Sequence, residues 1–202
     1  MGRRPSYERE AIVEAATGLF WERGYQSTSI GDLEERTGLD RSSLYHAFGS
    51  KQAVFEEALR RYVDEFEDRL GTALQAGGGL DGVAGFFAEM ARAFRSDPTG
   101  NARGCLMVNT VAELGSHDPI SSRLGAEYRD RLRQAFAAAL RQAAERGQLE
   151  PDQIQPRGNL LASLVMGLFL TARIDPVDAA EVCDSVAGEV RSWSTCSPEW
   201  NN

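Results

Sequence analysis

The sequence predicts an all-α fold of about nine helices. Apolar residues recur at positions i, i+3, i+4 and i+7 in one segment after another of the 202 residues, and no segment alternates as a half-buried strand does. Glycines and capping residues stand where such helices would begin and end. The longest apolar stretch, residues 160–172, is shorter than the roughly 20 residues that cross a membrane, so we expect a soluble, cytoplasmic chain.

The first two helices are marked by an apolar stripe and by their caps. The stripe predicts a helix that ends at Gly24, and a second, short helix follows at residues 30–37. Ser29 and Asp32 have the spacing of a capping box at its start, and Gly38 closes it. The stripe of the first helix consists of Ile12, Ala15, Ala16, Leu19 and Phe20.

The third helix has a polar outer face. Asp40 can cap a helix over residues 41–48, in which Leu44 and Phe48 would face inward. Two short helices joined by a turn with glycine, the second of them polar on its outer side, are typical of a helix-turn-helix DNA-binding unit. The outer side carries residue types that contact bases and phosphates, namely Arg41, Ser42, Tyr45 and His46.

Six further helices are predicted downstream. A long helix follows Ser50 and ends at the glycine-rich segment 77–82. We interpret that segment as a linker, because the Gly-Lys-Ser/Thr sequence of a phosphate-binding loop is missing from it. The remaining five helices are expected at residues 83–94, 104–114, 119–146, 155–173 and 176–193.

The charge balance limits how the chain could bind nucleic acid. Its 22 basic and 30 acidic residues give a net charge of -8, which excludes a generally basic surface. Residues 1–51 carry seven basic and eight acidic side chains, so DNA attraction must come from locally placed cations. We expect these at Arg3, Arg4, Arg41 and Lys51, the only lysine in the sequence.

Ser50 and Lys51 together predict an anion site at the start of the long helix. A serine cap leaves backbone amides and the positive end of the helix dipole beside the lysine ammonium. A DNA phosphate could bind there. The alternative for Lys51 is a solvated surface side chain.

The segment from Thr28 to Lys51 resembles the DNA-binding signature of the TetR/AcrR family of bacterial transcriptional regulators. Departures from the family's common residues occur at Glu34, Ser42 and Ala47, and they concern base preference rather than the module. The residues in register with the signature are Gly38, Leu44, Tyr45, Phe48, Ser50 and Lys51.

The resemblance implies a homodimeric repressor without a cofactor, which leaves double-stranded operator DNA when a small molecule enters its C-terminal domain. Residues 1–50 would form the DNA-binding domain, and residues 51–202 the effector-binding and dimerisation domain. Phosphate contacts are implied for Thr28 and Lys51. The DNA-binding residues that we expect are Thr28, Ser29, Arg41, Ser42, Ser43, Tyr45, His46 and Lys51.

The helix around residues 160–169 predicts a dimer interface. It is apolar nearly all round, and a single chain has too few other helices to cover it. Pairing with the last helix and with the same two helices of a second copy would cover it, whereas a central core helix is the alternative. The expected interface residues are Leu161, Leu164, Val165, Leu168, Val182, Val186 and Val190.

Aromatic and methionine side chains of the C-terminal helices predict a pocket for an apolar or aromatic effector. Plain core packing is the alternative for each of them. The candidates are Phe66, Phe87, Met90, Phe94, Cys105, Met107, Tyr128, Phe136 and Phe169.

Cys105 is a candidate sensor. It stands at the start of a predicted helix beside Arg103, where the helix dipole and the guanidinium would favour the thiolate. Together with Asn109 and Glu113, the sequence around it also resembles the family branch that includes the repressor of N-ethylmaleimide reductase, some members of which respond to electrophiles through this cysteine. A buried, unreactive thiol is the alternative.

Two other functions are weighed against DNA binding. Cys105 and His117 could form a nucleophile pair, but no third orienting group is visible, and we expect no enzyme. The acidic balance and Glu34 would suit a helical ligand-binding module without DNA recognition. Three widely spaced cysteines, with no C-x-x-C pair, predict neither a disulfide nor a metal site.

Overall fold

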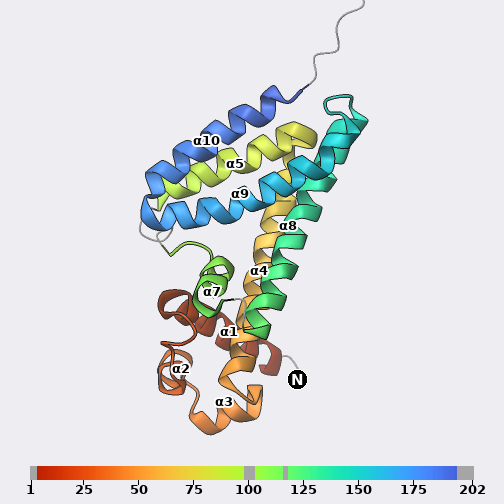
Figure 1. The fold of residues 1–202 in the computed structure, drawn as a ribbon. Coiled ribbons are helices and arrows are strands. Elements are labelled where there is room, and N and C mark those ends of the chain that lie inside the picture. The colour runs from red at the N-terminus through yellow and green to blue at the C-terminus, as the bar shows by residue number, and fades with distance from the viewer. Residues whose placement is uncertain (1–3, 98–102, 116–117, 195–202) are drawn as a thin grey trace, which may run out of the picture. The chain divides into compact units, whose positions relative to one another are not determined.

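The computed structural model of the chain describes residues 4–97, 103–115 and 118–194. Within these ranges every regular element is a helix, and nine of them are α-helices (Figure 1), so the prediction of an all-α fold with about nine helices is confirmed. No helix in the described ranges is both long enough and apolar enough to cross a lipid bilayer. The chain divides into two compact units, Met1–Glu65 with Cys105–Glu127, and Phe66–Gly104 with Tyr128–Asn202.

The first unit contains the first three helices, which include the predicted helix-turn-helix. It also contains the start of the long helix and a segment from the middle of the sequence, so residues 1–50 share it with later parts of the chain. Phe20 and Phe55 pack edge to face in its core, with ring centroids 4.9 Å apart. Its elements are α1 (Arg4–Arg23), α2 (Ile30–Thr37), α3 (Arg41–Phe48), the start of α4 (Lys51–Gly77), α7 (Leu106–Leu114) and the start of α8 (Pro119–Glu145).

The predicted caps of α2 and α3 form as expected. The Ser29 hydroxyl accepts a hydrogen bond from the Asp32 N–H, and the Asp32 carboxylate accepts one from the Ser29 N–H, which completes the capping box. Gly38 ends α2 with φ 72°, a left-handed conformation that favours glycine. Asp40 caps α3 by accepting from the Ser43 N–H.

The second unit is built on three helices beside the remaining parts of α4 and α8 (Figure 1). In it α10 packs against both α5 and α9. The N-cap of α10 is Asp175, and Pro176 occupies the first turn, as the sequence predicts. The elements of this unit are α5 (Gly79–Ser96), a 3-10 helix (Pro151–Gln153), α9 (Ile154–Ile174) and α10 (Pro176–Ser192).

The interpretation of residues 77–82 as a linker is wrong. The long helix α4 continues to Gly77, and α5 starts at Gly79, so only Gly78 separates them. The glycines serve close packing instead. A Cβ on Gly82 would lie 2.1 Å from the carbonyl oxygen of Leu74, so only glycine allows α5 to approach α4 this closely.

Candidate nucleic-acid interface

The helix α3 presents one side to the core of the first unit and the other to solvent. Leu44 and Phe48 are buried, whereas Tyr45 is 43% exposed. The Arg41 guanidinium lies over the Tyr45 ring, with 5.9 Å between its central carbon and the ring centroid. The outward side chains thus include those for which the sequence predicts base and phosphate contacts: Arg41, Ser42, Tyr45 and His46 are exposed, and Ser43 is half-buried.

Two carboxylates fix the start of α3. Asp40 accepts from the Ser43 N–H at 2.7 Å, and this bond holds the pKa of Asp40 below its usual range. Glu34 accepts from the Arg41 N–H at 2.6 Å, so it satisfies a backbone donor at a helix N-terminus. The sequence suggested Glu34 as an argument against DNA recognition; the structure gives it a role in orienting α3.

Arg9 fixes the other end of α3, and sequence reasoning missed it. Its guanidinium forms two hydrogen bonds with the Glu57 carboxylate, at 2.9 and 2.6 Å, and donates a third to the Ala47 carbonyl at 2.8 Å. It also lies 4.2 Å from the centroid of the Phe48 ring. A single arginine therefore joins α1, the last turn of α3 and α4. The partners are 38 and 48 residues away in sequence, so no local pattern could have revealed the contact.

The ammonium of Lys51 is engaged within the protein. It donates to the carbonyl oxygens of Tyr25 at 2.9 Å and Thr28 at 2.7 Å, and it lies 4.2 Å from the centroid of the Tyr25 ring. One of its three N–H donors is left for another acceptor. The ammonium group that was expected to bind an anion thus mainly binds the turn that precedes α2. Ser50 caps α4 as predicted, because its hydroxyl accepts from the Ala53 N–H.

Thr28 and Ser29 differ in exposure. The Thr28 side chain is 1% exposed, and its hydroxyl donates to the Gly24 carbonyl at 2.6 Å, so it lies inside the unit instead of at a DNA-facing surface. Ser29 is exposed, but its hydroxyl serves the capping box. Of the four cations expected to attract DNA, Arg3 and the Arg4 side chain lie outside the described residues. Arg41 is exposed at the start of α3.

The nine expected effector-pocket residues are divided between the units. Cys105 and Met107 belong to the first, and the other seven belong to the second. Phe169 is half-buried, and the remaining eight are buried. Within the second unit the rings form two clusters: Phe66 contacts Tyr128 and Phe169, which in turn contacts Phe94, while Phe87 stacks on Phe136 at 6.1 Å.

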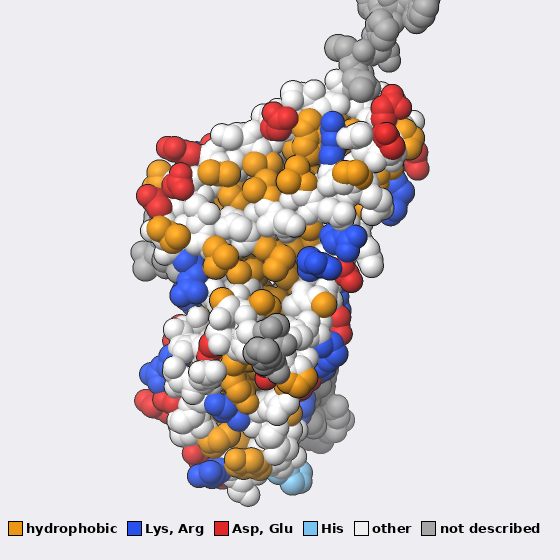
Figure 2. All heavy atoms as spheres, viewed as in Figure 1, with side chains coloured by type: hydrophobic (Ala, Val, Ile, Leu, Met, Phe, Trp, Pro, Cys, Tyr) orange, Lys and Arg blue, Asp and Glu red, His pale blue; other side chains and the backbone are white. Residues whose placement is uncertain are grey.

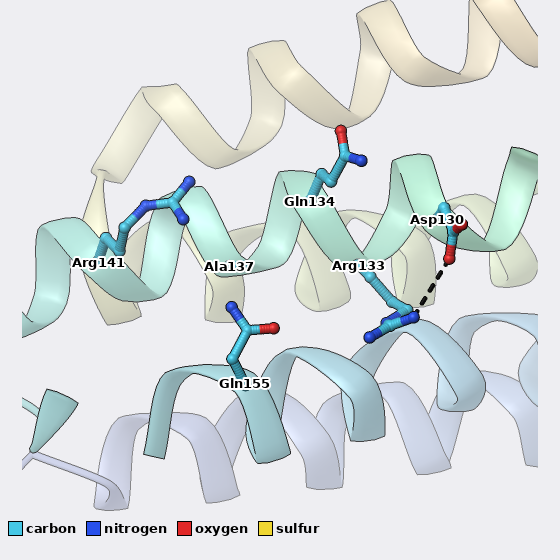
Figure 3. A pocket seen from close by; sticks show the side chains of 6 residues that line it. All are labelled: Asp130, Arg133, Gln134, Ala137, Arg141 and Gln155. Carbon is cyan, nitrogen blue, oxygen red and sulfur yellow. Dashed lines mark hydrogen bonds and ion pairs between the residues drawn. The ribbon is translucent and has the colours of Figure 1, made fainter. Parts of the chain in front are cut away.

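A hollow of about 260 Å³ does exist in the second unit, between α8 and the start of α9. Ala137 is one of its lining residues, and Figure 3 shows Arg133 and Gln155 extending between the two helices. Arg133 is already bonded to Asp130 at 3.2 Å and to Asn159 at 2.6 Å. None of the nine expected pocket residues lines this polar hollow, whose lining is Asp130, Arg133, Gln134, Ala137, Arg141 and Gln155.

Two of the cysteines are buried. Cys105 is the N-cap residue of α7, and its exposed fraction is 0%. Cys183 is equally buried, and removal from water raises the pKa of its thiol to about 12. Cys196 and His117 lie outside the described residues.

The expected dimer-interface residues, all in the second unit, differ in how far they are buried. Leu161, Val165, Leu168 and Val190 are at most 2% exposed, so they are already covered within the single chain. Leu164, Val182 and Val186 are half-buried. The exposed apolar side chains lie on neighbouring positions that were not among the expected interface residues, and Figure 2 shows hydrophobic side chains gathered over this part of the unit. They are Leu160 (58% exposed), Leu170 (45%), Ile174 (87%) and Val177 (54%).

Comparisons with known proteins agree with this geometry. Residues 12–58 match the family model described as bacterial regulatory proteins, tetR family. The HTH-type transcriptional repressor ComR of Escherichia coli K12 is 30% identical over 178 residues, which cover 85% of this chain and 82% of ComR. The matched segment contains α2, α3 and the Glu34 and Asp40 carboxylates that fix the start of α3, whereas Arg9 lies just before it.

Solved structures support the same relationship. A cysteine mutant of the TetR family regulator CifR, complexed with 26 bp double-strand operator DNA, has a TM-score of 0.75 at 27% identity, covering 93% of this chain and 96% of CifR. Reduced NemR from E. coli has a TM-score of 0.79 at 22% identity, covering 95% of this chain and 98% of NemR, and this likeness shows the fold alone. The match to ComR over most of both chains and the family model over the helix-turn-helix together show that the chain belongs to the TetR family of bacterial transcriptional regulators.

Proposed function

We propose that the chain is a transcriptional repressor that binds double-stranded operator DNA through α3. The observation that carries this proposal is the construction of α3: both ends are fixed by side-chain contacts to its backbone, while its outer side exposes Arg41, Tyr45 and His46. A fixed helix with guanidinium, hydroxyl and imidazole groups outward suits the major groove. The complex of CifR with operator DNA provides a precedent in a related chain.

The experiment is a binding titration with the DNA upstream of the chain's own gene. Fluorescence anisotropy would compare this fragment with a scrambled duplex of equal length at the same salt concentration. We expect the upstream fragment to bind at least about a thousandfold more tightly. Equal affinity for both duplexes would contradict the proposal. It would favour a helical ligand-binding module that lacks DNA recognition.

We also propose that the repressor is a homodimer that pairs through α9 and α10. Ile174 is 87% exposed, so most of its apolar surface is left in water in the single chain. With Leu160, Leu170 and Val177 it forms an apolar surface that a second copy could cover, while Leu164, Val182 and Val186 lie half-buried beside it. Leu161, Val165, Leu168 and Val190 would support this surface from beneath.

We propose separately that a small molecule, or modification of Cys105, releases the repressor from its operator. Release by an apolar or aromatic molecule requires that the clusters around Phe66 and Phe87 open, because their rings already contact one another. Release by modification requires that a reagent reach Cys105, whose exposed fraction is 0%. The modification route can be tested by operator release: hypochlorite should release the wild type from operator DNA and leave Cys105→Ser unaffected if the thiol is the sensor. Equal release of both proteins would exclude it.

A further inference from the structure

The turn between α1 and α2 is held by a residue of α7 that is distant in sequence. The Glu113 carboxylate accepts hydrogen bonds from the Tyr25 N–H at 3.0 Å and the Gln26 N–H at 2.7 Å. These two donors stand 88 and 87 residues before it. A carboxylate that accepts two adjacent backbone N–H groups makes charge-assisted bonds, which are stronger than bonds between neutral groups.

The chain leaves room for this carboxylate at Gly24. Gly24 has φ 81°, and a Cβ added to it would lie 2.7 Å from a carboxylate oxygen of Glu113. Any larger residue would therefore meet both backbone strain and a collision with the carboxylate. Gly24 thus serves two purposes: it ends α1, and it opens the space that Glu113 occupies.

Lys51 holds the same turn from the carbonyl side. Its ammonium group donates hydrogen bonds to the Tyr25 and Thr28 carbonyl oxygens. The Lys51 ammonium therefore binds carbonyl oxygens of this turn, and the Glu113 carboxylate binds N–H groups of the same turn. The turn leads directly into α2, and α2 carries the Glu34 side chain that bonds to the first N–H of α3. The conformation of the turn consequently sets where α2 begins and, through Glu34, how α3 is held.

We propose that Glu113 is a positioning residue for operator binding, which fixes the α1–α2 turn so that α3 is held in its DNA-binding orientation. The proposal rests on the operator binding proposed above. When only a fraction of molecules has the competent arrangement, the apparent affinity falls by that fraction. Loss of the carboxylate would therefore weaken operator binding although Glu113 itself need not touch DNA.

The test compares Glu113→Gln with Glu127→Gln as a matched control. Glu127 is an exposed glutamate of the same unit, and it forms an ion pair with Arg123 one helical turn away. A glutamine at 113 keeps the size of the side chain but can accept only through its single oxygen, since its NH₂ group is a donor. We expect Glu113→Gln to lower operator affinity about tenfold. Amide hydrogen exchange of residues 25 and 26 should accelerate, and Glu127→Gln should change neither readout.

The two readouts separate the possible failures. Faster exchange with unchanged operator affinity would overturn the positioning role, and unchanged exchange would overturn the contact itself. If the wild type binds no operator, the proposed function fails, and with it the role of Glu113 in DNA binding; the exchange experiment would still decide whether Glu113 holds the turn. Circular dichroism of each variant confirms that the helices are intact.

A double-mutant cycle tests the contact without DNA. Gly24→Ala introduces strain in both backgrounds, but the collision with the carboxylate exists only when Glu113 is present. Gly24→Ala should therefore accelerate exchange of residues 25 and 26 less in a Glu113→Ala background than in the wild type. Additive effects of the two substitutions would show that the carboxylate does not lie against Gly24.

Discussion

Lys51 and Glu113 bind the two ends of one peptide group, the one that joins Tyr25 to Gln26. The ammonium of Lys51 lies 2.9 Å from its carbonyl oxygen, and the carboxylate of Glu113 lies 2.7 Å from its N–H nitrogen. The positive group thus faces the negative end of the peptide dipole, and the negative group faces its positive end. The arrangement ties α4 and α7 to the entrance of the helix-turn-helix through backbone atoms, which every residue except proline would supply at positions 25 and 26.

Lys51→Met should lower the stability of the protein. It keeps an unbranched apolar stem but removes two hydrogen bonds from a charged donor, for which we expect a loss of about 2–4 kcal/mol in the free energy of unfolding. Urea unfolding followed by circular dichroism measures this loss. Arg60→Met is the control, because its ion pair with Glu56 is exposed and should contribute less than about 0.5 kcal/mol. Unchanged stability with weaker binding to every DNA would instead make Lys51 a phosphate ligand.

Arg41→Ala should weaken operator binding specifically. A guanidinium that reads a base edge contributes about 1–3 kcal/mol at one position, and its loss should leave the affinity for scrambled DNA nearly unchanged. The fold should survive, because the bond to Glu34 comes from the Arg41 backbone. Anisotropy titrations with operator and scrambled duplexes provide the comparison. Losses of equal size on the two duplexes would assign Arg41 to the phosphate backbone.

Ile174→Asp should dissociate the proposed dimer. The side chain is 87% exposed in the single chain, so the substitution should leave the subunit folded while placing a charge in the apolar interface. Light scattering coupled to size-exclusion chromatography should report half the wild-type mass. Ala138→Asp, at an exposed position of α8 in the same unit, is the control and should remain dimeric. A wild type that is itself monomeric at micromolar concentration would refute the dimer.

A low pH should remove the contribution that the Asp32 carboxylate of the capping box makes to the stability of the protein. Hydrogen bonds from the Ser29 hydroxyl and N–H, and the nearby Arg23, lower the pKa of Asp32 in the folded protein. A carboxyl with a lowered folded pKa stabilises the protein above its unfolded pKa and loses that effect as the pH falls through the folded value. The melting temperatures of the wild type and Asp32→Asn should therefore converge below about pH 4. A difference that is constant with pH would exclude this linkage.

Thiol labelling should distinguish a poised sensor from a structural cysteine. Burial raises the pKa of Cys183 to about 12, so we expect no alkylation of this thiol by iodoacetamide in the folded protein near neutral pH. Cys105 should react only as fast as α7 opens, because it is 0% exposed. Mass spectrometry of tryptic peptides identifies the labelled residue. Labelling of Cys105 at the rate of a free thiol would support its reactivity towards electrophiles.

The parts of the site that the sequence could predict are those determined by neighbours along the chain. The Ser29–Asp32 capping box, the Asp40 cap and Gly38 depend on contacts over at most four residues, and all of them form. The inward direction of Leu44 and Phe48 follows in the same way from helical spacing. Periodicity and capping were therefore sufficient for the helix-turn-helix.

The remaining features depend on residues that are distant in sequence. Nothing in the sequence around Lys51 or Glu113 indicates that both meet the turn at Tyr25, because the partners are 26 and 88 residues apart. The segment around α9 shows a second kind of limit. It is apolar nearly all round, so periodicity could not decide that Leu161 is buried at 1% while Leu160 is 58% exposed.

The engagement of the sole lysine has a practical consequence for chemical labelling. Lys51 carries the only side-chain amine in these 202 residues to which an amine-reactive dye or surface could attach. Two carbonyl oxygens and an aromatic ring occupy its surroundings. Mild acylation should accordingly leave Lys51 unmodified while the helix-turn-helix is folded. Acylation of Lys51 would report that the helix-turn-helix has come apart.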